Sequence, residues 1–130
     1  MTAEERDRIN RAKHFLERGR FADLQLKHYG ERLRQLKENA AADESCHELP
    51  EIRSCREDIG KKTVELLRIQ NEIEAAIDEL DDPGEQVVLR MRYLTYMKWE
   101  DIAEELGYEM RQIYRIRNRA CLSIKFQNMS

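Results

Sequence analysis

The fold of the C-terminal third of the chain is decided by the stretch Trp99-Glu-Asp-Ile-Ala-Glu-Glu-Leu-Gly-Tyr-Glu-Met-Arg-Gln-Ile-Tyr-Arg-Ile116. Apolar residues recur at helical spacing on both sides of Gly107, which predicts helices over 99–106 and from 110 to about 126, joined by a tight turn. The small Ala103 lets these helices cross closely, so the pattern predicts a helix-turn-helix. The side chains expected to face inward are Ile102, Leu106, Ile113, Ile116, Ala120 and Ile124.

The opposite face of the second predicted helix carries polar and basic side chains, namely Arg111, Gln112, Arg115, Asn118 and Arg119. Arg forms paired hydrogen bonds with guanine, and Gln or Asn does so with adenine. Since the first residues of such a helix contact base edges, we expect base reading by Arg111, Gln112 and Arg115. The expected phosphate contacts are Lys98, Arg117 and Arg119. The alternative is a basic face that only meets solvent.

Just upstream, Asp82-Pro83-Gly84-Glu85 has the composition of a helix start, with a capping Asp, a Pro in the first turn and an acid at the third position. It predicts a further helix over 85–94. The sequence therefore divides into residues 83–130, a DNA-binding unit, and residues 1–82, a long helical extension.

A regular repeat of three and four residues runs through the extension, along Ile52, Cys55, Ile59, Lys62, Leu66, Ile69, Ile73, Ala76 and Leu80. It predicts one long helix beginning near Pro50 with a narrow seam to bury. A second long helix is predicted over residues 2–39, with Gly19 and Gly30 as places for a bend or break. The fold class is all-α, with a helical hairpin or coiled coil before the helix-turn-helix.

Two partners could cover this seam: the first helix, folded back antiparallel, or a second copy of the chain. Gly19, Asp23 and Gly30 interrupt the stripe of the first helix. This interruption favours a homodimer with Leu66, Ile69 and Ile73 at or beside the interface, and the sequence leaves the choice open.

Charge is distributed unevenly along the chain. The whole chain has a net charge of -3, yet residues 83–130 carry eight Lys and Arg against six Asp and Glu. From Arg111 to Lys125 there are five basic residues and no acidic one. Positive charge thus gathers where contacts with double-stranded DNA are expected.

The block Val88-Leu-Arg-Met-Arg-Tyr followed by Trp99-Glu-Asp-Ile-Ala-Glu-Glu-Leu-Gly-Tyr resembles region 4 of sigma-70-type factors. With Ala12-Lys-His-Phe-Leu16 and Asp78-Glu-Leu-Asp-Asp-Pro83, the chain resembles small prophage-encoded regulators of the domain of unknown function 1492 family, relatives of phage late-gene activators. Where that family usually has Ser as the cap of the recognition helix, this chain has Glu109. The resemblance implies a phage-derived transcriptional regulator.

Other chemistry is not expected. Cys46, His47 and Cys55 lack the paired spacing of a structural zinc site, and no phosphate loop or nucleophile elbow occurs, so we expect neither metal, cofactor nor enzymatic activity. Three scattered cysteines, a charged N-terminus and the lack of a long apolar run favour a cytoplasmic protein without a membrane partner.

Three functions are compatible with these patterns. The first is a sequence-specific DNA-binding regulator. The second is a sigma-like accessory protein that docks on RNA polymerase and has little DNA affinity of its own. The third is a packaging protein that recognises phage DNA. The sequence specifies neither the target site nor the choice between activation and repression.

Overall fold

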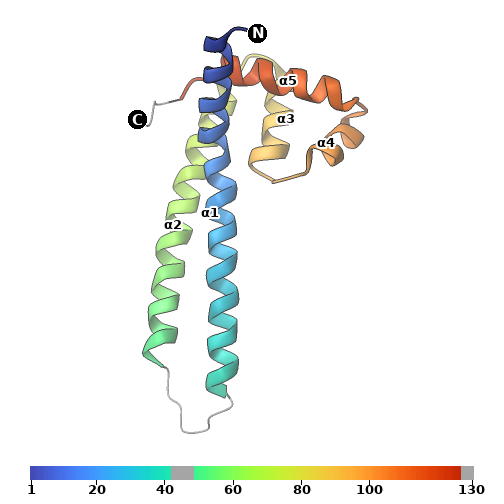
Figure 1. The fold of residues 1–130 in the computed structure, drawn as a ribbon. Coiled ribbons are helices and arrows are strands. Elements are labelled where there is room, and N and C mark those ends of the chain that lie inside the picture. Colours follow the sequence, from blue (N-terminus) through green and yellow to red (C-terminus); the bar gives the residue numbers. More distant parts are fainter. Residues whose placement is uncertain (42–48, 127–130) are drawn as a thin grey trace. The chain divides into compact units, whose positions relative to one another are not determined.

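The computed structural model describes residues 1–41 and 49–126, and over these residues it contains helices and no strand. These residues form five helices, which Figure 1 shows coloured in chain order. Their bounds are α1 Ala3–Ala41, α2 Pro50–Asp78, α3 Pro83–Tyr93, α4 Trp99–Leu106 and α5 Met110–Ser123. The prediction of an all-helical chain with a long N-terminal helix is confirmed.

The helix ends agree with the sequence signals in most places. α2 begins at Pro50, and α4 ends at Leu106, where Gly107 takes a left-handed conformation with φ of 71°. α3 begins at Pro83, since the Asp82 carboxylate accepts a hydrogen bond from the Gly84 amide at 2.8 Å. The last helix, expected to reach residue 126, ends at Ser123 because Ile124 is extended.

α1 runs without a break through both of its glycines, so neither Gly19 nor Gly30 interrupts the helix. Gly19 is buried, and a Cβ atom there would lie 3.3 Å from Ile73 Cδ1 and 3.4 Å from the Tyr96 hydroxyl. The missing side chain therefore permits close packing against Ile73 and Tyr96. Gly30 is exposed with open space around it.

The chain divides into two compact units, each of which takes part of α1 and part of α2. Unit 1 comprises residues 1–20 and 69–130, and unit 2 comprises residues 21–68. Unit 1 therefore draws residues from both sides of the sequence division at residue 82.

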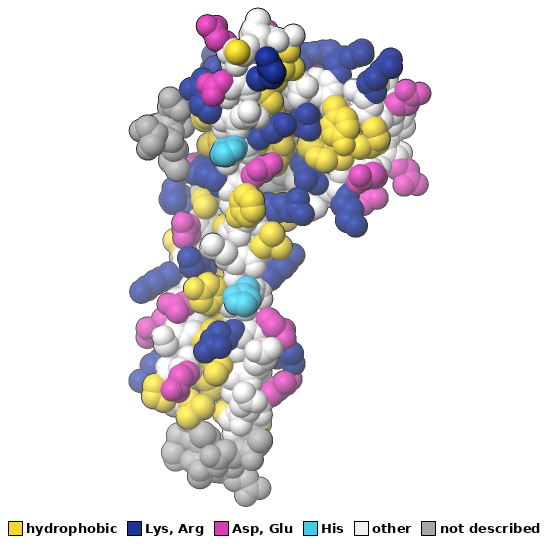
Figure 2. Space-filling view, in the orientation of Figure 1, with side chains coloured by type: hydrophobic (Ala, Val, Ile, Leu, Met, Phe, Trp, Pro, Cys, Tyr) yellow, Lys and Arg dark blue, Asp and Glu magenta, His cyan; other side chains and the backbone are white. Residues whose placement is uncertain are grey.

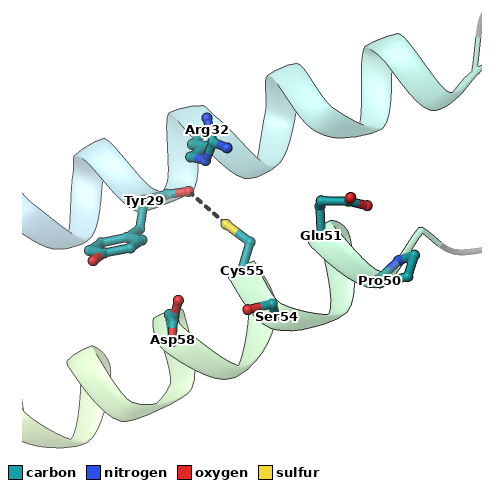
Figure 3. Close-up of a pocket in the computed structure, with 7 residues that line it drawn as sticks. All are labelled: Tyr29, Arg32, Pro50, Glu51, Ser54, Cys55 and Asp58. Carbon is teal, nitrogen blue, oxygen red and sulfur yellow. Dashed lines mark hydrogen bonds between the residues drawn. The ribbon is translucent and has the colours of Figure 1, made fainter.

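In unit 2, a segment of α1 lies beside a segment of α2. The Cys55 thiol points to the Tyr29 carbonyl oxygen, with Sγ 3.5 Å away, and the Lys62 ammonium lies 5.9 Å from the centre of the Tyr29 ring. Figure 3 shows the two segments and the thiol contact. This pairing covers the Cys55 part of the seam within one chain.

The seam is largely buried in a single chain. Leu66, Ile69 and Ile73 are 7%, 6% and 0% exposed. They are not available to a partner chain unless the helices separate, so the exposed seam from which the homodimer was expected is absent.

Unit 1 holds the main core. α3, α4 and α5 contact one another pairwise, and Val88, Ile102 and Ile113 are fully buried between them. The predicted inward positions are confirmed: Ala120 and Ile124 are also fully buried, while Leu106 and Ile116 are half-buried beside the core.

Candidate nucleic-acid interface

The turn between α4 and α5 is fixed by backbone hydrogen bonds. The amide of Tyr108 donates to the Ala103 carbonyl at 2.9 Å, and the amide of Gly107 donates to the Glu104 carbonyl at 3.3 Å. These bonds cap the carbonyl end of α4 while Gly107 turns the chain. Residues 107–109 separate Leu106 from Met110, where α5 begins.

One side of α5 anchors it to unit 1. Ile113, Ala120 and Cys121 are fully buried. Burial also raises the pKa of the Cys121 thiol to about 11, so this cysteine stays a neutral packing group at physiological pH. With this side fixed, the side chains on the opposite side of α5 must face solvent.

We call that exposed side the outer arc, formed by Arg111, Gln112, Arg115, Asn118 and Arg119. All of these except the half-buried Asn118 are exposed. Among the described residues, no carboxylate forms an ion pair with Arg111 or Arg115. Figure 2 shows Lys and Arg side chains gathered along the α5 edge at the top of the view. The arc therefore presents positive charge that internal ion pairs do not fully neutralise.

Two amides of the outer arc are partly engaged. The Gln112 side-chain oxygen accepts the backbone N–H of Glu109 at 3.0 Å, which caps the start of α5. The Asn118 side-chain oxygen accepts two hydrogen bonds from Arg117, at 3.0 and 3.1 Å. Each amide keeps its NH₂ group for donation, but paired bonding to adenine would require its oxygen to be released.

Arg119 faces an acidic neighbour at one flank of the arc. Its Nη1 lies 3.9 Å from Asp82 Oδ2, and both side chains are about half exposed. An exposed pair of this kind contributes about 0–1 kcal/mol, so Arg119 can leave it for a stronger anion.

A group of aromatic and arginine side chains, which we call the Trp99 cluster, lies at the start of α4. The Trp99 ring packs edge-on against Tyr93 and Tyr114, with centroid distances of 6.2 and 6.0 Å. Arg92 and Arg117 place their guanidinium carbons 4.9 and 5.7 Å from the centre of the Trp99 ring. Such cation–π contacts hold both charges beside the ring.

The sequence did not single out Arg92 or Tyr114, because the cluster brings together residues far apart in the chain. Arg117 is half-buried in this cluster and does not belong to the outer arc. Lys98, the remaining predicted site residue, is exposed at the N-cap of α4 and makes no side-chain cap bond there.

α4 carries charge of the opposite sign. Its exposed acidic residues are Glu100, Asp101, Glu104 and Glu105. The surfaces of α4 and α5 are thus electrostatically distinct, and an anion would meet favourable charge on the outer arc and unfavourable charge on α4.

Other regions offer less defined chemistry. A pocket of about 370 Å³ in unit 2 is lined by Tyr29, Arg32, Pro50, Glu51, Ser54, Cys55 and Asp58. Within residues 1–41 and 49–126, no group of three or more His, Cys, Asp or Glu is placed to hold a metal ion. Cys46 and His47, considered above for zinc, lie outside the described residues. The helices of the described part are too short or too polar to cross a membrane.

Comparison with known proteins places the chain in a family without assigning a function to it. No curated protein and no solved structure matches the chain. A family model matches residues 48–125, which is more than half of the sequence, and the chain therefore belongs to the family described as a protein of unknown function (DUF1492).

Proposed function

We propose that the protein is a sequence-specific DNA-binding transcriptional regulator, related to region 4 of sigma-70-type factors and of phage origin, without enzymatic activity. The observation that carries this proposal is the outer arc, where Arg111 and Arg115 are exposed and lack ion pairs within the described residues. Their helix is anchored by buried side chains on its other side.

In this proposal α4 and α5 form the helix-turn-helix, and α5 enters the major groove. Arg111 and Arg115 lie four residues apart, about one turn of helix, so both can face the same groove. Each guanidinium can form paired hydrogen bonds with a guanine. Gln112 adds a donor at the start of the helix, where contacts with base edges are concentrated.

Phosphate contacts are assigned to the flanks. Lys98 and the Trp99 cluster lie at the start of α4, and Arg119 lies at the flank of the arc that faces Asp82. Arg117 uses Nε and Nη2 toward Asn118, so further N–H groups of its guanidinium remain for a phosphate oxygen. Contact with the rings restricts Arg92 and Arg117, which reduces the entropy lost when they bind.

A second candidate function is docking on RNA polymerase. The acidic surface of α4 favours it, because four exposed carboxylates repel DNA and suit a basic protein surface. In that case α5 adds little DNA affinity on its own.

A DNA-binding experiment separates these candidates. The protein is tagged and its sites are mapped by footprinting in the host, and a labelled promoter fragment from such a site is then titrated with the protein, with and without RNA polymerase. The proposed function requires binding without polymerase. Binding that appears only with polymerase would support the second candidate and contradict the first.

The homodimer is kept as part of the proposal on functional grounds alone, because two recognition helices read two half-sites about one DNA turn apart. Its interface would have to lie outside the buried seam. Sedimentation equilibrium at micromolar concentration tests it. A single species at 15.6 kDa, the mass of one chain, would show that the protein is monomeric.

A further inference from the structure

A pocket with basic walls lies in unit 1, between the N-terminal part of α1 and the residues that follow α5. It has a volume of about 250 Å³ and is lined by Arg8, Arg11, Ile124, Lys125 and Phe126. Three of these five side chains carry positive charge. None of them belongs to the outer arc or to the Trp99 cluster.

The pocket is held together by specific contacts. Arg8 donates from Nε to the Leu122 carbonyl at 2.9 Å and from Nη2 to the Ile124 carbonyl at 3.2 Å. The rings of Phe15 and Phe126 stack with their centres 4.9 Å apart. These contacts fix the chain after α5 against α1, which explains why α5 ends at Ser123 and why Lys125 and Arg11 line the same pocket.

The charge balance of the pocket favours an anion. Arg11 pairs with Asp7 at 3.1 Å, and both side chains are more than half exposed, so the pair is weak. The Glu5 carboxylate on the same helix accepts the Thr2 amide. Arg8 uses two of its five N–H groups on the carbonyls. Three cationic side chains thus line the pocket against one paired carboxylate, which leaves an excess of two positive charges.

The length of α5 relates this pocket to DNA. Its 14 residues extend about 21 Å, whereas the major groove is about 12 Å wide. If the first turns of a helix of this length contact bases, its last turn lies near the sugar–phosphate backbone. In homeodomains, the C-terminal end of the helix that contacts bases also contacts the backbone. The basic pocket lies at that end of α5.

We infer that the pocket formed by Arg8, Arg11 and Lys125 binds a backbone phosphate of the DNA, so that α1 takes part in DNA binding. The inference rests on the proposed function. It extends the contact surface to residues far from α4 and α5 in sequence, and it concerns affinity rather than base preference, because phosphate contacts do not distinguish sequences.

The test measures binding of a labelled DNA duplex at several salt concentrations for the full-length wild type and the variants Arg11→Gln and Lys125→Gln. Each variant should weaken binding roughly eightfold at about 0.1 M salt and reduce the slope of log K against log salt by about 1. The loss should be equal for specific and unrelated duplexes. Lys61→Gln, an exposed position in unit 2, is the control for the same loss of charge and should bind like the wild type.

A third variant tests the sign of the effect. Asp7→Asn removes the carboxylate that pairs with Arg11, so it should strengthen binding, and thermal unfolding should confirm that all variants remain folded. If the wild type binds DNA and Arg11→Gln and Lys125→Gln match Lys61→Gln, the inference is wrong and the proposed function stands. If the wild type does not bind DNA, both are wrong.

Discussion

The two units of this protein bury their side chains to different degrees. In unit 1, large side chains from every helix lose all contact with solvent, among them Leu16, Ile73 and Ile113. In unit 2, the most buried side chains, Ile52, Cys55 and Leu66, keep 5–7% of their surface exposed. Phe21, Leu24, Val64 and Leu67 of unit 2 are at least half exposed.

This difference follows from the number of helices that meet. Two helix segments can cover only one side of each other, whereas segments of five helices in unit 1 enclose side chains from several directions. The candidate interface lies on the more enclosed unit. A helix held rigidly on its inner side can present Arg111 and Arg115 in fixed positions, which favours binding because less flexibility is lost.

The largest expected effect is the loss of a fully enclosed side chain. Ile113→Ala should lower the free energy of unfolding by about 2–5 kcal/mol, because it leaves a cavity among α3, α4 and α5. The matched change in unit 2, Ile52→Ala, should cost less, since the end of a two-helix pair can collapse around the gap. Urea unfolding of both variants checks the order, and equal losses would show that the units are equally well packed.

The next effect concerns the turn before α5. Gly107 has φ of 71°, and a Cβ atom there would touch nothing within 4 Å, so the penalty for Gly107→Val comes mainly from backbone strain. We expect a loss of about 1–2 kcal/mol, together with loss of DNA binding as α5 shifts.

The control for this turn is Gly60→Val in unit 2, where the glycine is helical and also has open space. It should melt at nearly the wild-type temperature. If both valine variants were as stable as the wild type, the conformation of Gly107 would not determine the turn.

A smaller effect distinguishes the two glycines of α1. Gly30→Ala should stabilise the protein by up to about 1 kcal/mol, because alanine favours the helix and the site is open. Gly19→Ala should gain less or lose stability, since its new methyl group would press on Ile73 and Tyr96. The difference between the melting temperatures of Gly30→Ala and Gly19→Ala measures how closely α1 packs at Gly19. Identical gains in the two variants would show that Gly19 is not closely packed.

The smallest effect is a dependence on pH from Glu85, a buried acid at the start of α3. Burial raises its pKa above the ordinary 4.5, nearby Asp82 adds to the rise, and Arg119 opposes it. The folded state thus holds this proton more tightly than the unfolded chain does. The resulting stability is present below pH 4.5 and is lost as the pH rises through the higher folded pKa.

Glu85→Gln should therefore be more stable than the wild type at pH 7, and the gap should close below pH 4.5. Unfolding at several pH values measures the gap. The variant Glu57→Gln, exposed in unit 2, removes the same charge as a control. If the stability advantage of Glu85→Gln over the wild type instead grew as the pH fell, burial would not raise the pKa of Glu85.

Local signals predicted much of the fold, because helix starts and stops depend on neighbouring residues. Pro50, the Asp82 cap and Gly107 each mark a boundary that the structure has. The sequence permitted a break at Gly19, but α1 continues through it, since the cost of about 1 kcal/mol for glycine is offset where α1 approaches Ile73. The early end of α5 depends on Arg8, more than a hundred residues away, and no local pattern indicates it.

The candidate site was also predicted only in part, because a local sequence pattern shows which residues share a helix face but not which side chains touch. Helical periodicity placed Arg111 and Arg115 on the solvent side of α5, as the structure has them. It could not show that Arg117 packs on Trp99, or that the oxygens of Gln112 and Asn118 are already engaged. Those features depend on side-chain contacts, some of them between separate helices, which a one-dimensional pattern does not contain.

The most direct test of the central claim is a salt titration of DNA binding by Arg115→Ala and Arg119→Ala, with the exposed Arg53→Ala of unit 2 as control. Arg115→Ala should weaken binding to its site by about 1–3 kcal/mol and relax the preference at one base position. Arg119→Ala should weaken all sequences alike, with a salt slope lower by about 1. Arg53→Ala should change neither. If all three variants bind like the wild type at matched salt, the outer arc of α5 does not bind DNA.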